Sequence, residues 1–427
     1  MHIVLIAPSW RSVSGPTTKS LFPPLSLAVV AALTPSEHTV RIIDESVEDI
    51  DPDLEADLVG ITCLTAVAPR AYEIADSFRS RGVPVVLGGM HPSALPEEAA
   101  KHADCVVVGE AEGVWEQVLE DIQAGRARKI YRSKERPSLA GLPIPRRDLF
   151  DPRKYYTTST IQTSRGCPYS CSFCSVTRFF GRTYRTRPIA DILREIETLK
   201  DRIVLFVDDN IVGNPAHARE LFRALIPYRL RWIGQSSINI AWDQELLALA
   251  AKSGCMGLFI GFESLAAENL KKVGKGLLNR VDSFLKAIKR IHSHGIGIEG
   301  AFIFGFDQDD EGVFARTVEF AKKARLAAAQ FGILTPFPGT PLFADLESQG
   351  RIVDRSWSRY TISNAVFEPL KMSREKLEQG FRWAYREFYS YRSIVRRLIP
   401  FKRHLPFFLT LNISFRRIAL QPRYSEK

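Results

Sequence analysis

Three cysteines lie within eight residues of this 427-residue chain, at Cys167, Cys171 and Cys174. They are half of its six cysteines, and their C-x₃-C-x₂-C spacing puts three thiols in one loop with glycine, proline and serine. Closely spaced thiolates bind metal ions and iron–sulfur clusters. Because a four-iron cluster needs four ligands, three cysteines would leave one iron open to a substrate or a cofactor.

Two alternatives to an iron–sulfur cluster stay open for these cysteines. They could be three buried structural cysteines, although the spacing is not that of core residues on a helix or strand. They could also hold a structural zinc ion, but such a site needs a fourth Cys or His from a second paired knuckle. The remaining cysteines, Cys63, Cys105 and Cys255, are single and scattered, so a four-iron cluster is favoured.

The cysteines directly follow the first strand of a predicted α/β series. Six continuous apolar runs alternate with amphipathic helices, which favours parallel strands joined by helices. The strands are expected at Thr160–Ser164, Ile203–Asp208, Trp232–Ile238, Gly257–Phe262, Gly297–Phe304 and Ala328–Leu334. Six units are two short of a full barrel, so we expect a partial (β/α)₆ barrel over residues 159–344, with the cysteines at the carboxyl ends of its strands.

Residues 1–125 predict a second α/β unit. Five strands separated by helices indicate a doubly wound, Rossmann-like sheet of the flavodoxin-like type, whose ligands bind at the carboxyl ends of the strands. The strands are expected at His2–Ala7, His38–Ile43, Leu58–Thr62, Val83–Leu87 and Ala103–Val108, with a helix at Pro96–His102 before the last of them. The polar, proline-rich residues 126–158 are expected to be a linker, and residues 345–427 a helical, basic C-terminal extension.

Charge and hydropathy exclude several classes of protein. Residues 392–427 carry nine Lys and Arg side chains and one Glu, and so account for +8 of the net charge of +10. The nearly neutral remainder does not support nucleic-acid binding. The chain has no secretory signal pattern and no apolar run long enough to span a membrane, so a reducing cytoplasm is the expected compartment.

Within the cysteine loop, Phe173 completes a C-x₃-C-x-φ-C pattern in which φ is aromatic. The chain here resembles the radical S-adenosylmethionine (SAM) superfamily. That resemblance implies a [4Fe–4S] cluster on the three cysteines, SAM on the open iron, and an electron donor of flavodoxin or ferredoxin type. It also implies SAM contacts from Phe173, from Gly261 and Glu263 after the fourth strand, and from Ile303 and Gly305 on the fifth.

Two further segments near the predicted strand ends have open roles. Asp208-Asp209-Asn210 could contact SAM or cap a helix. Pro336-Phe-Pro-Gly-Thr-Pro341 resembles a turn of many relatives and could contact a ligand or form a rigid loop.

The N-terminal unit resembles the cobalamin-binding branch of the same superfamily. The matching segments are Ala68-Pro-Arg-Ala-Tyr72, Leu87-Gly-Gly-Met-His-Pro92 and Val108-Gly-Glu-Ala-Glu-Gly113. The resemblance implies a cobalamin site made by Thr62, Thr65, Gly88, Gly89, His91, Gly109 and Glu110. Glycines at strand ends suit a large flat ligand because they let it approach the backbone closely.

The loop after the first strand departs from that of many cobalamin proteins. They supply a ligating histidine there, whereas residues 9–19 contain none, so such a ligand is not expected here. His91 could line the site, or it could only cap a helix or make loop hydrogen bonds. A domain that no longer binds cobalamin stays an alternative.

These features predict a cobalamin-dependent radical SAM enzyme that methylates an unactivated carbon through a 5′-deoxyadenosyl radical. Its substrate would be a small molecule, either lipid-like or a secondary metabolite. A cobalamin-assisted cyclisation, rearrangement or ring contraction is the first alternative, and a non-catalytic iron–sulfur or cobalamin sensor is another. The basic, aromatic residues 396–420 predict either peripheral contact with an anionic membrane or a terminal helix packed on the barrel.

Overall fold

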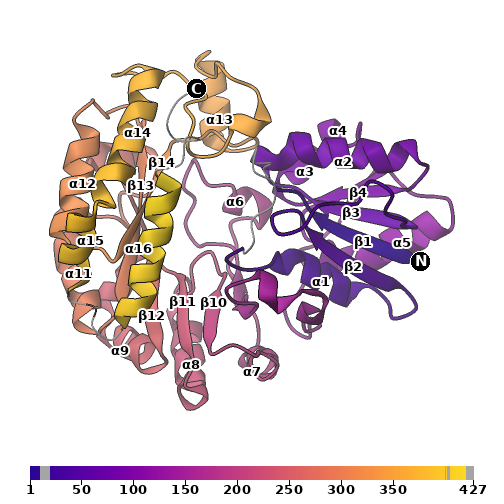
Figure 1. The fold of residues 1–427 in the computed structure, drawn as a ribbon, viewed down its shortest axis with the longest axis horizontal. Helices are drawn as coiled ribbons and strands as arrows, with labels where there is room; N and C mark the ends of the chain where they lie inside the picture. Colours follow the sequence, from indigo (N-terminus) through magenta and orange to yellow (C-terminus); the bar gives the residue numbers. More distant parts are fainter. Residues whose placement is uncertain (10–19, 400, 402–403, 420–427) are drawn as a thin grey trace.

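The computed structural model describes residues 1–9, 20–399, 401 and 404–419. It contains two α/β units side by side, with a helical C-terminal region on the second unit (Figure 1). The segment 10–19, where a ligating histidine was not expected, lies outside the described residues.

The N-terminal unit is built on a parallel sheet of six strands in the order β2-β1-β3-β4-β5-β6. This order confirms the flavodoxin-like prediction. The strands are β1 (His2–Ala7), β2 (Thr39–Asp44), β3 (Leu58–Thr62), β4 (Val85–Gly88), β5 (Cys105–Val108) and β6 (Ile130–Arg132). Helices α1 (Leu25–Leu33) and α5 (Trp115–Gln123) contribute to the apolar core on one face, and α2 (Ala68–Ser80) contributes to the core on the other.

Two details of this unit differ from expectation. The sixth strand, β6, comes from the segment expected to be a linker, because Tyr131 is buried within it and its backbone pairs with β5. The helix expected over residues 96–102 is shorter, α4 (Pro96–Ala99), and a second short helix, α3 (Met90–Ala94), precedes it. Pro96 starts α4, and proline disfavours helical backbone in the residue before it.

The second unit is a partial barrel, as predicted. Its six parallel strands run in the order β14-β13-β12-β11-β10-β7. They are β7 (Thr160–Ile161), β10 (Ile203–Phe206), β11 (Arg231–Gln235), β12 (Cys255–Glu263), β13 (Gly297–Phe304) and β14 (Ala328–Ile333). The helices of this unit are α6 (Val176–Phe179), α7 (Ile189–Ile196), α8 (Pro215–Leu225), α9 (Gln244–Lys252), α10 (Ala267–Lys272), α11 (Phe284–Ser293) and α12 (Val313–Lys323).

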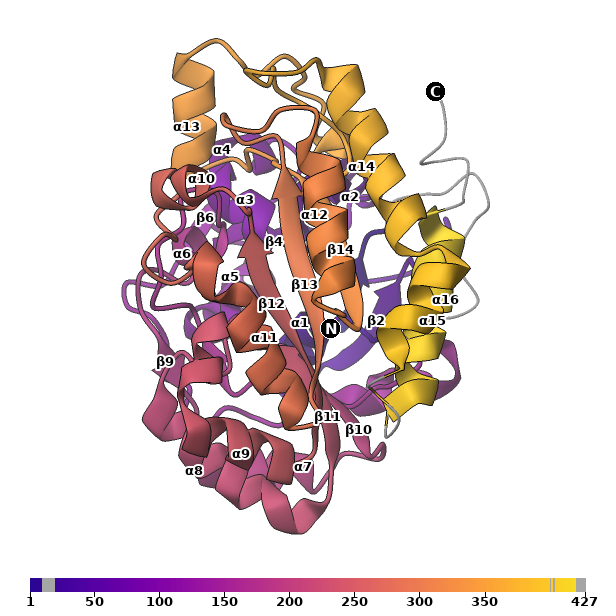
Figure 2. The same cartoon turned by 90° about the vertical axis from the view of Figure 1, so that its left-hand side faces the viewer.

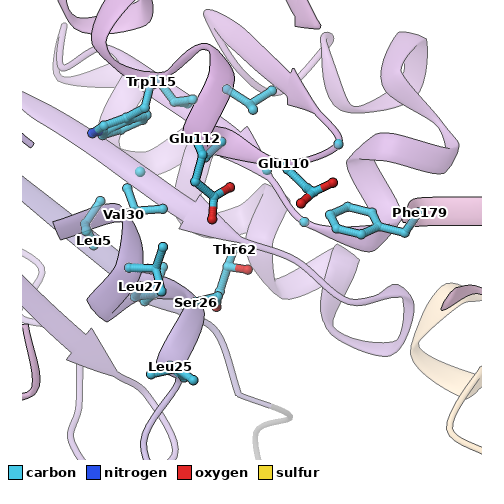
Figure 3. Close-up of a pocket in the computed structure, with 18 of the residues that line it drawn as sticks. Leu5, Leu25, Ser26, Leu27, Val30, Thr62, Glu110, Glu112, Trp115 and Phe179 are labelled. Carbon is cyan, nitrogen blue, oxygen red and sulfur yellow. The ribbon is translucent and has the colours of Figure 1, made fainter. Parts of the chain in front are cut away.

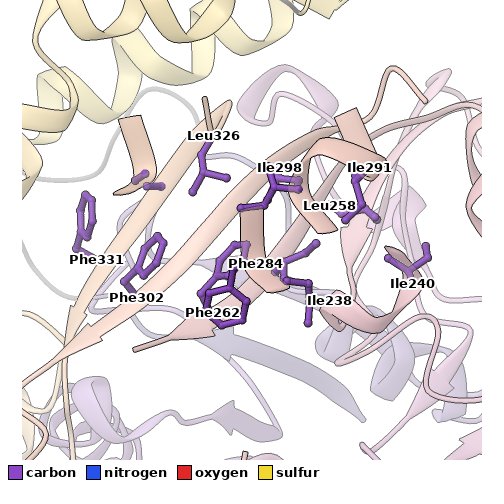
Figure 4. Close-up of a cluster of buried hydrophobic side chains, with 14 of the residues drawn as sticks. Ile238, Ile240, Leu258, Phe262, Phe284, Ile291, Ile298, Phe302, Leu326 and Phe331 are labelled. Atoms are coloured by element: carbon purple, nitrogen blue, oxygen red, sulfur yellow. The ribbon is translucent and has the colours of Figure 1, made fainter. Parts of the chain in front are cut away.

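Aliphatic and aromatic side chains fill the layer between the barrel strands and their helices (Figure 4). Phe262 of β12 stacks on Phe302 of β13 with ring centroids 5.4 Å apart, and Phe302 stacks on Phe331 of β14 at 6.0 Å. Neighbouring parallel strands therefore carry one continuous aromatic ladder, which fixes their register at the site end of the barrel.

The C-terminal region packs against the last barrel strand. It contains α13 (Pro341–Ser348), α14 (Arg374–Phe388), α15 (Tyr391–Leu398) and α16 (Leu405–Ala419), the last three being seen in yellow tones in Figure 2. Buried Arg397 donates to the carbonyl oxygens of Leu326 and Ala327, and a Cβ on Gly297 would collide with the ring of Phe408. Helix α16 is therefore a terminal helix packed on the barrel. Among the described residues, no helix is long and apolar enough to cross a membrane.

Candidate active site between the two sheets

The cysteine loop begins where the first barrel strand is interrupted. The expected strand 160–164 is split into β7 and β8 (Ser164–Arg165), and β8 pairs antiparallel with β9 (Arg185–Thr186). Buried Asp208 causes the break, because its carboxylate accepts from the Thr163 N–H at 3.0 Å, the Thr163 hydroxyl at 2.8 Å and the Ser164 hydroxyl. The chain therefore leaves the barrel at Thr163 and turns toward the N-terminal unit.

The three loop cysteines are partly buried free thiols. Burial raises the pKa of all three, to about 11 for Cys174, so metal binding would have to displace the thiol protons. In the part of the chain that the structure describes, no three His, Cys, Asp or Glu side chains converge on one metal ion. A [4Fe–4S] cluster needs no such convergence, because each thiolate binds a different iron.

The loop is held in place from two sides. The Ser172 N–H donates to the Val273 carbonyl at 3.1 Å, and the Ser172 carbonyl accepts from the Leu342 N–H at 3.0 Å. Leu342 follows the Pro336–Pro341 turn, in which the Thr340 hydroxyl caps α13. The turn thus acts here as a rigid support for the cysteine loop, and Phe173 packs against the main apolar core beside it.

Glu263 ends β12 in an unusual backbone conformation, with φ of 64°. Its carboxylate pairs with Lys275, whose ammonium also donates to the Gly261 carbonyl at 3.0 Å. A Cβ on Gly261 would overlap the Glu263 carboxylate, so glycine is needed for this side chain to fold back. Burial lowers the pKa of Lys275, but Glu263 and the nearby cysteines outweigh it and raise the pKa overall. A charged pair therefore lies near the cysteine loop.

The other residues expected to contact SAM have structural contacts. Gly305 has φ of 98°, and a Cβ there would meet Leu377 of α14 at 2.9 Å. Ile303 is partly buried against the apolar core. Asn210 accepts from the Ser237 N–H at 3.0 Å, and Asp209 accepts from the Gly166 N–H at 3.2 Å, so the Asp208–Asn210 segment anchors two loops.

A cavity of about 330 Å³ opens at the carboxyl edge of the N-terminal sheet (Figure 3). Apolar side chains such as Leu5, Leu27 and Trp115 line its interior, and Thr62, Gly88, Gly89, Gly109 and Glu110 line its rim. Gly109 has φ of 85°, and a Cβ there would project into open space. Barrel residues Gln162, Arg165, Phe179 and Phe180 also line this cavity, so it faces the cysteine loop.

These lining residues fit a large, flat, mainly apolar ligand. Gly60 leaves room for the Leu5 side chain at the floor of the cavity, since a Cβ on Gly60 would meet a methyl group of Leu5 at 2.8 Å. Glycines at the ends of two neighbouring strands, Gly88 and Gly89 at β4 and Gly109 at β5, leave the rim low, and the walls beneath are apolar. A corrin ring needs such a surface, because it offers much apolar area and few charges.

Two residues expected at the cobalamin site lie elsewhere. His91 is fully buried, its Nε2 lies 3.1 Å from the Tyr72 hydroxyl and 3.3 Å from Glu98, and its ring packs edge-on against Trp357. Thr65 is buried in a short 3₁₀ turn and does not line the cavity. His91 therefore contacts side chains of α2 and α4 and does not line the cavity.

Sequence reasoning missed two charged residues of the site, Lys275 and Arg165. Lys275 stands in Val273-Gly-Lys-Gly276, which matches no motif. Arg165 does have a signal, because it directly precedes Gly166-Cys167, and its guanidinium binds Glu110 and Glu112 of the N-terminal unit. Glu110, expected to bind cobalamin, thus lines the cavity with its carboxylate already held by arginine.

Comparison with known proteins gives the family. The radical SAM superfamily model matches residues 161–321, and the B12-binding-domain model matches residues 12–119. Bacteriochlorophyllide d C-12(1)-methyltransferase of Chlorobaculum tepidum is 35% identical over 387 residues, which cover 88% of this chain and 84% of that one. The chain belongs to the cobalamin-binding branch of the radical SAM superfamily.

Other relatives agree with this assignment. Bacteriochlorophyllide d C-8(2)-methyltransferase of the same organism is 32% identical, with 94% of this chain and 93% of that one covered. Among solved structures, the radical SAM methyltransferase TsrM from Kitasatospora setae, with cobalamin and a [4Fe–4S] cluster bound, has a TM-score of 0.68 at 18% identity and covers 98% of this chain and 99% of its own. The fold is therefore shared along nearly the whole chain, and the protein is a radical SAM enzyme, which sets aside the sensor alternative.

Proposed function

We propose that this protein is a cobalamin-dependent radical SAM methyltransferase that methylates an unactivated carbon of a large apolar ring system. The observation that carries the proposal is that residues on both sides of the cysteine loop, Arg165 and Phe179, line the apolar cavity at the edge of the N-terminal sheet. A substrate held between the cysteine loop and the cavity would lie within reach of the cofactors at both.

Each cofactor has residues suited to it. Cys167, Cys171 and Cys174 would hold the cluster, and Glu263, with Lys275 beside it, would bind SAM, together with backbone near Phe173 and Ile303. Thr62, Gly88, Gly89 and Gly109 would border the cobalamin. When bound, the cluster and SAM supply a radical that removes hydrogen, and cobalamin supplies a transferable methyl group. A flavodoxin- or ferredoxin-type protein would supply the electron.

The relatives support a ring-shaped substrate. Both chlorophyllide methyltransferases are named for a tetrapyrrole, and the hopanoid C-2 methylase of Rhodopseudomonas palustris, 28% identical, is named for a polycyclic lipid. A chlorin-type tetrapyrrole is our first candidate, since these two methyltransferases match most of this chain at more than 30% identity.

Product analysis tests the chemistry. The anaerobically reconstituted protein, with dithionite and SAM, should form 5′-deoxyadenosine and S-adenosylhomocysteine together, and should transfer a labelled methyl group to a chlorin. Deoxyadenosine without S-adenosylhomocysteine would instead favour cyclisation, the reaction for which a 26% identical relative is named. A protein that takes up no cobalamin would overturn the proposal.

We also propose that α15 and α16 contact an anionic membrane surface. An exposed apolar row is formed by Tyr391 and Val395 of α15 with Ile399 directly after it, and another on α16 by Leu405, Leu409 and Ile413. The Arg416 guanidinium lies 4.1 Å from the centre of the Tyr391 ring and joins the two rows. Residues 391–419 contain no acidic side chain, so their charge complements anionic lipid.

Vesicle sedimentation tests this contact. The protein should sediment with vesicles containing phosphatidylglycerol and not with pure phosphatidylcholine, and V395S/I399S should weaken binding about tenfold through lost apolar burial. Equal binding by the variant and the parent would refute apolar insertion.

A further inference from the structure

Buried charged side chains join the loop after β5 to the loop that carries the cysteines. The Arg165 guanidinium donates from Nη1 to Glu110 Oε2 at 2.7 Å and from Nη2 to Glu112. Its Nε donates to Gln162 Oε1 at 2.9 Å. All three nitrogens of the fork are thus engaged, and the Arg165 and Glu110 side chains are only 9% and 3% exposed.

A second arginine completes this network. Arg185 lies opposite Arg165 in the β8–β9 pairing, and its Nη2 donates to Glu110 Oε1 at 2.6 Å. Two carboxylates therefore face the buried guanidinium of Arg165 and the half-buried guanidinium of Arg185, with Arg136 at the margin, 3.6 Å from Glu110. Burial lowers the pKa of Arg165, but Glu112 and Glu110 outweigh it, so the net shift is upward and the group is charged.

The network has a short, rigid connection to the first cysteine. Gly166 separates Arg165 from Cys167 and has φ of 87°, where a Cβ would overlap the Thr183 carbonyl. The Gly166 N–H is bound by Asp209. Because Gly166 has little conformational freedom, a displacement of Arg165 would be passed on to Cys167.

The same charged network also lines the cavity at the edge of the N-terminal sheet. Glu110, Glu112 and Arg165 all line it, and Figure 3 shows the two carboxylates beside the cavity. Gly109, directly before Glu110, is held by the Ser93 hydroxyl, which accepts its N–H at 2.9 Å. The same charges thus contact the cobalamin rim and the start of the cluster loop.

We propose that Arg165 is a positioning residue that sets the cluster loop against the cobalamin rim through Glu110 and Glu112. The inference rests on the proposed function. In this proposal, Glu110 connects the two cofactor sites and does not bind cobalamin. Loss of the link would leave both cofactors bound but misaligned, so radical formation would continue with less methyl transfer.

The choice of variants follows from the charges. Arg165→Gln alone leaves Glu112 buried without a partner, which is strongly destabilising and could prevent folding. The double variant E112Q/R165Q removes one charge of each sign, while Glu110 keeps Arg185. Arg153→Gln is the matched control, because Arg153 pairs with Asp151 on the surface with 89% of its side chain exposed.

The first experiment measures coupling in the holoprotein. E112Q/R165Q should retain parental iron and cobalamin contents but form at least about tenfold more 5′-deoxyadenosine per methyl group transferred, and Arg153→Gln should match the parent. A parental ratio in the double variant would overturn the inference. Loss of either cofactor from the double variant would also overturn it, because Arg165 would then be needed for assembly.

The second experiment needs no cofactor. Hydrogen–deuterium exchange of the cofactor-free protein should be faster in E112Q/R165Q at residues 163–175 and 108–114, and unchanged elsewhere in the barrel. Unchanged exchange in both segments would overturn the link. If the parent protein formed no deoxyadenosine, the proposed function would fail, while faster exchange would still establish the link between the two loops.

Discussion

The carboxyl edges of the two sheets differ in how they are built to hold a ligand. The N-terminal edge offers glycines and an apolar hollow, and its polar groups are few. The barrel edge offers three thiols, the Glu263–Lys275 pair and the buried Asp208, whose carboxylate is held by specific hydrogen bonds. The first edge suits binding by shape and apolar burial, and the second suits binding by coordination and charge. Single substitutions should therefore have larger and more selective effects at the barrel edge.

The largest effect is expected at the cysteines. Cys171→Ser should lose most of the cluster iron and lower deoxyadenosine formation more than about 100-fold, because one of only three ligands is gone. Iron content and the visible absorption of the reconstituted protein measure this. Cys63→Ser is the control: this thiol is buried in the N-terminal unit and donates to the Leu64 carbonyl, a bond that serine can keep. An intact cluster in Cys171→Ser would mean that the ligands are assigned wrongly.

The next largest effect is expected at the charged pair. Lys275→Met should lower SAM affinity about 100-fold and destabilise the fold by roughly 3 kcal/mol, because the Glu263 carboxylate is left buried and unpaired. E263Q/K275M should recover the stability without recovering SAM binding. Equilibrium dialysis with SAM and urea unfolding separate the two quantities. Recovery of both in the double variant would show that the pair is only structural.

Substitutions at the N-terminal edge, which suits binding by shape (the shape-based edge), should have smaller effects. At Gly88 the nearest atom to an added Cβ is 3.9 Å away, so Gly88→Val fits the backbone and projects its methyl groups toward the cavity. We expect cobalamin affinity to fall about tenfold, equal to roughly 1.4 kcal/mol, with cluster iron unchanged. Titration of the apoprotein with hydroxocobalamin, followed by absorbance, measures the affinity. Undiminished affinity would place the corrin elsewhere.

Most of the fold could be predicted from local patterns of apolar residues. Apolar runs such as His2–Ala7 and Gly297–Phe304 needed only their periodicity, and both are strands within those bounds. Strand β6 was missed because three residues with one buried side chain leave no periodic signal. The split of the first barrel strand was missed because it depends on Asp208, 45 residues further along the chain.

The site was predictable where a motif carries the chemistry, and less so where partners come from distant residues. Cys167–Cys174 could be proposed from spacing alone. The contact between Arg165 and Glu110 spans 55 residues and two units, and no local pattern encodes it. Glu110 matched a cobalamin-site motif, yet its carboxylate is bound by arginine.

The smallest effect on cofactor binding is expected at His91. Its substitution tests whether the cobalamin site extends beyond the residues that line the cavity. His91 lies beside the cavity rim in sequence but is buried against Tyr72, Glu98 and Trp357. His91→Gln should change cobalamin affinity by less than about twofold, while it lowers the free energy of unfolding by roughly 1 to 2 kcal/mol through lost hydrogen bonding.

The pH dependence of that loss identifies the residue as structural. Burial, opposed by Glu98, lowers the pKa of folded His91 below its value of 6.5 in the unfolded chain. Its neutral form therefore contributes stability above pH 6.5 that is lost as the pH falls toward the folded pKa. The stability difference between parent and His91→Gln should shrink between about pH 7.5 and about pH 5.5 in urea unfolding, and His102→Gln, a more exposed neighbour of Tyr72, is the control. A large fall in cobalamin affinity with no change in stability would instead make His91 a cofactor ligand.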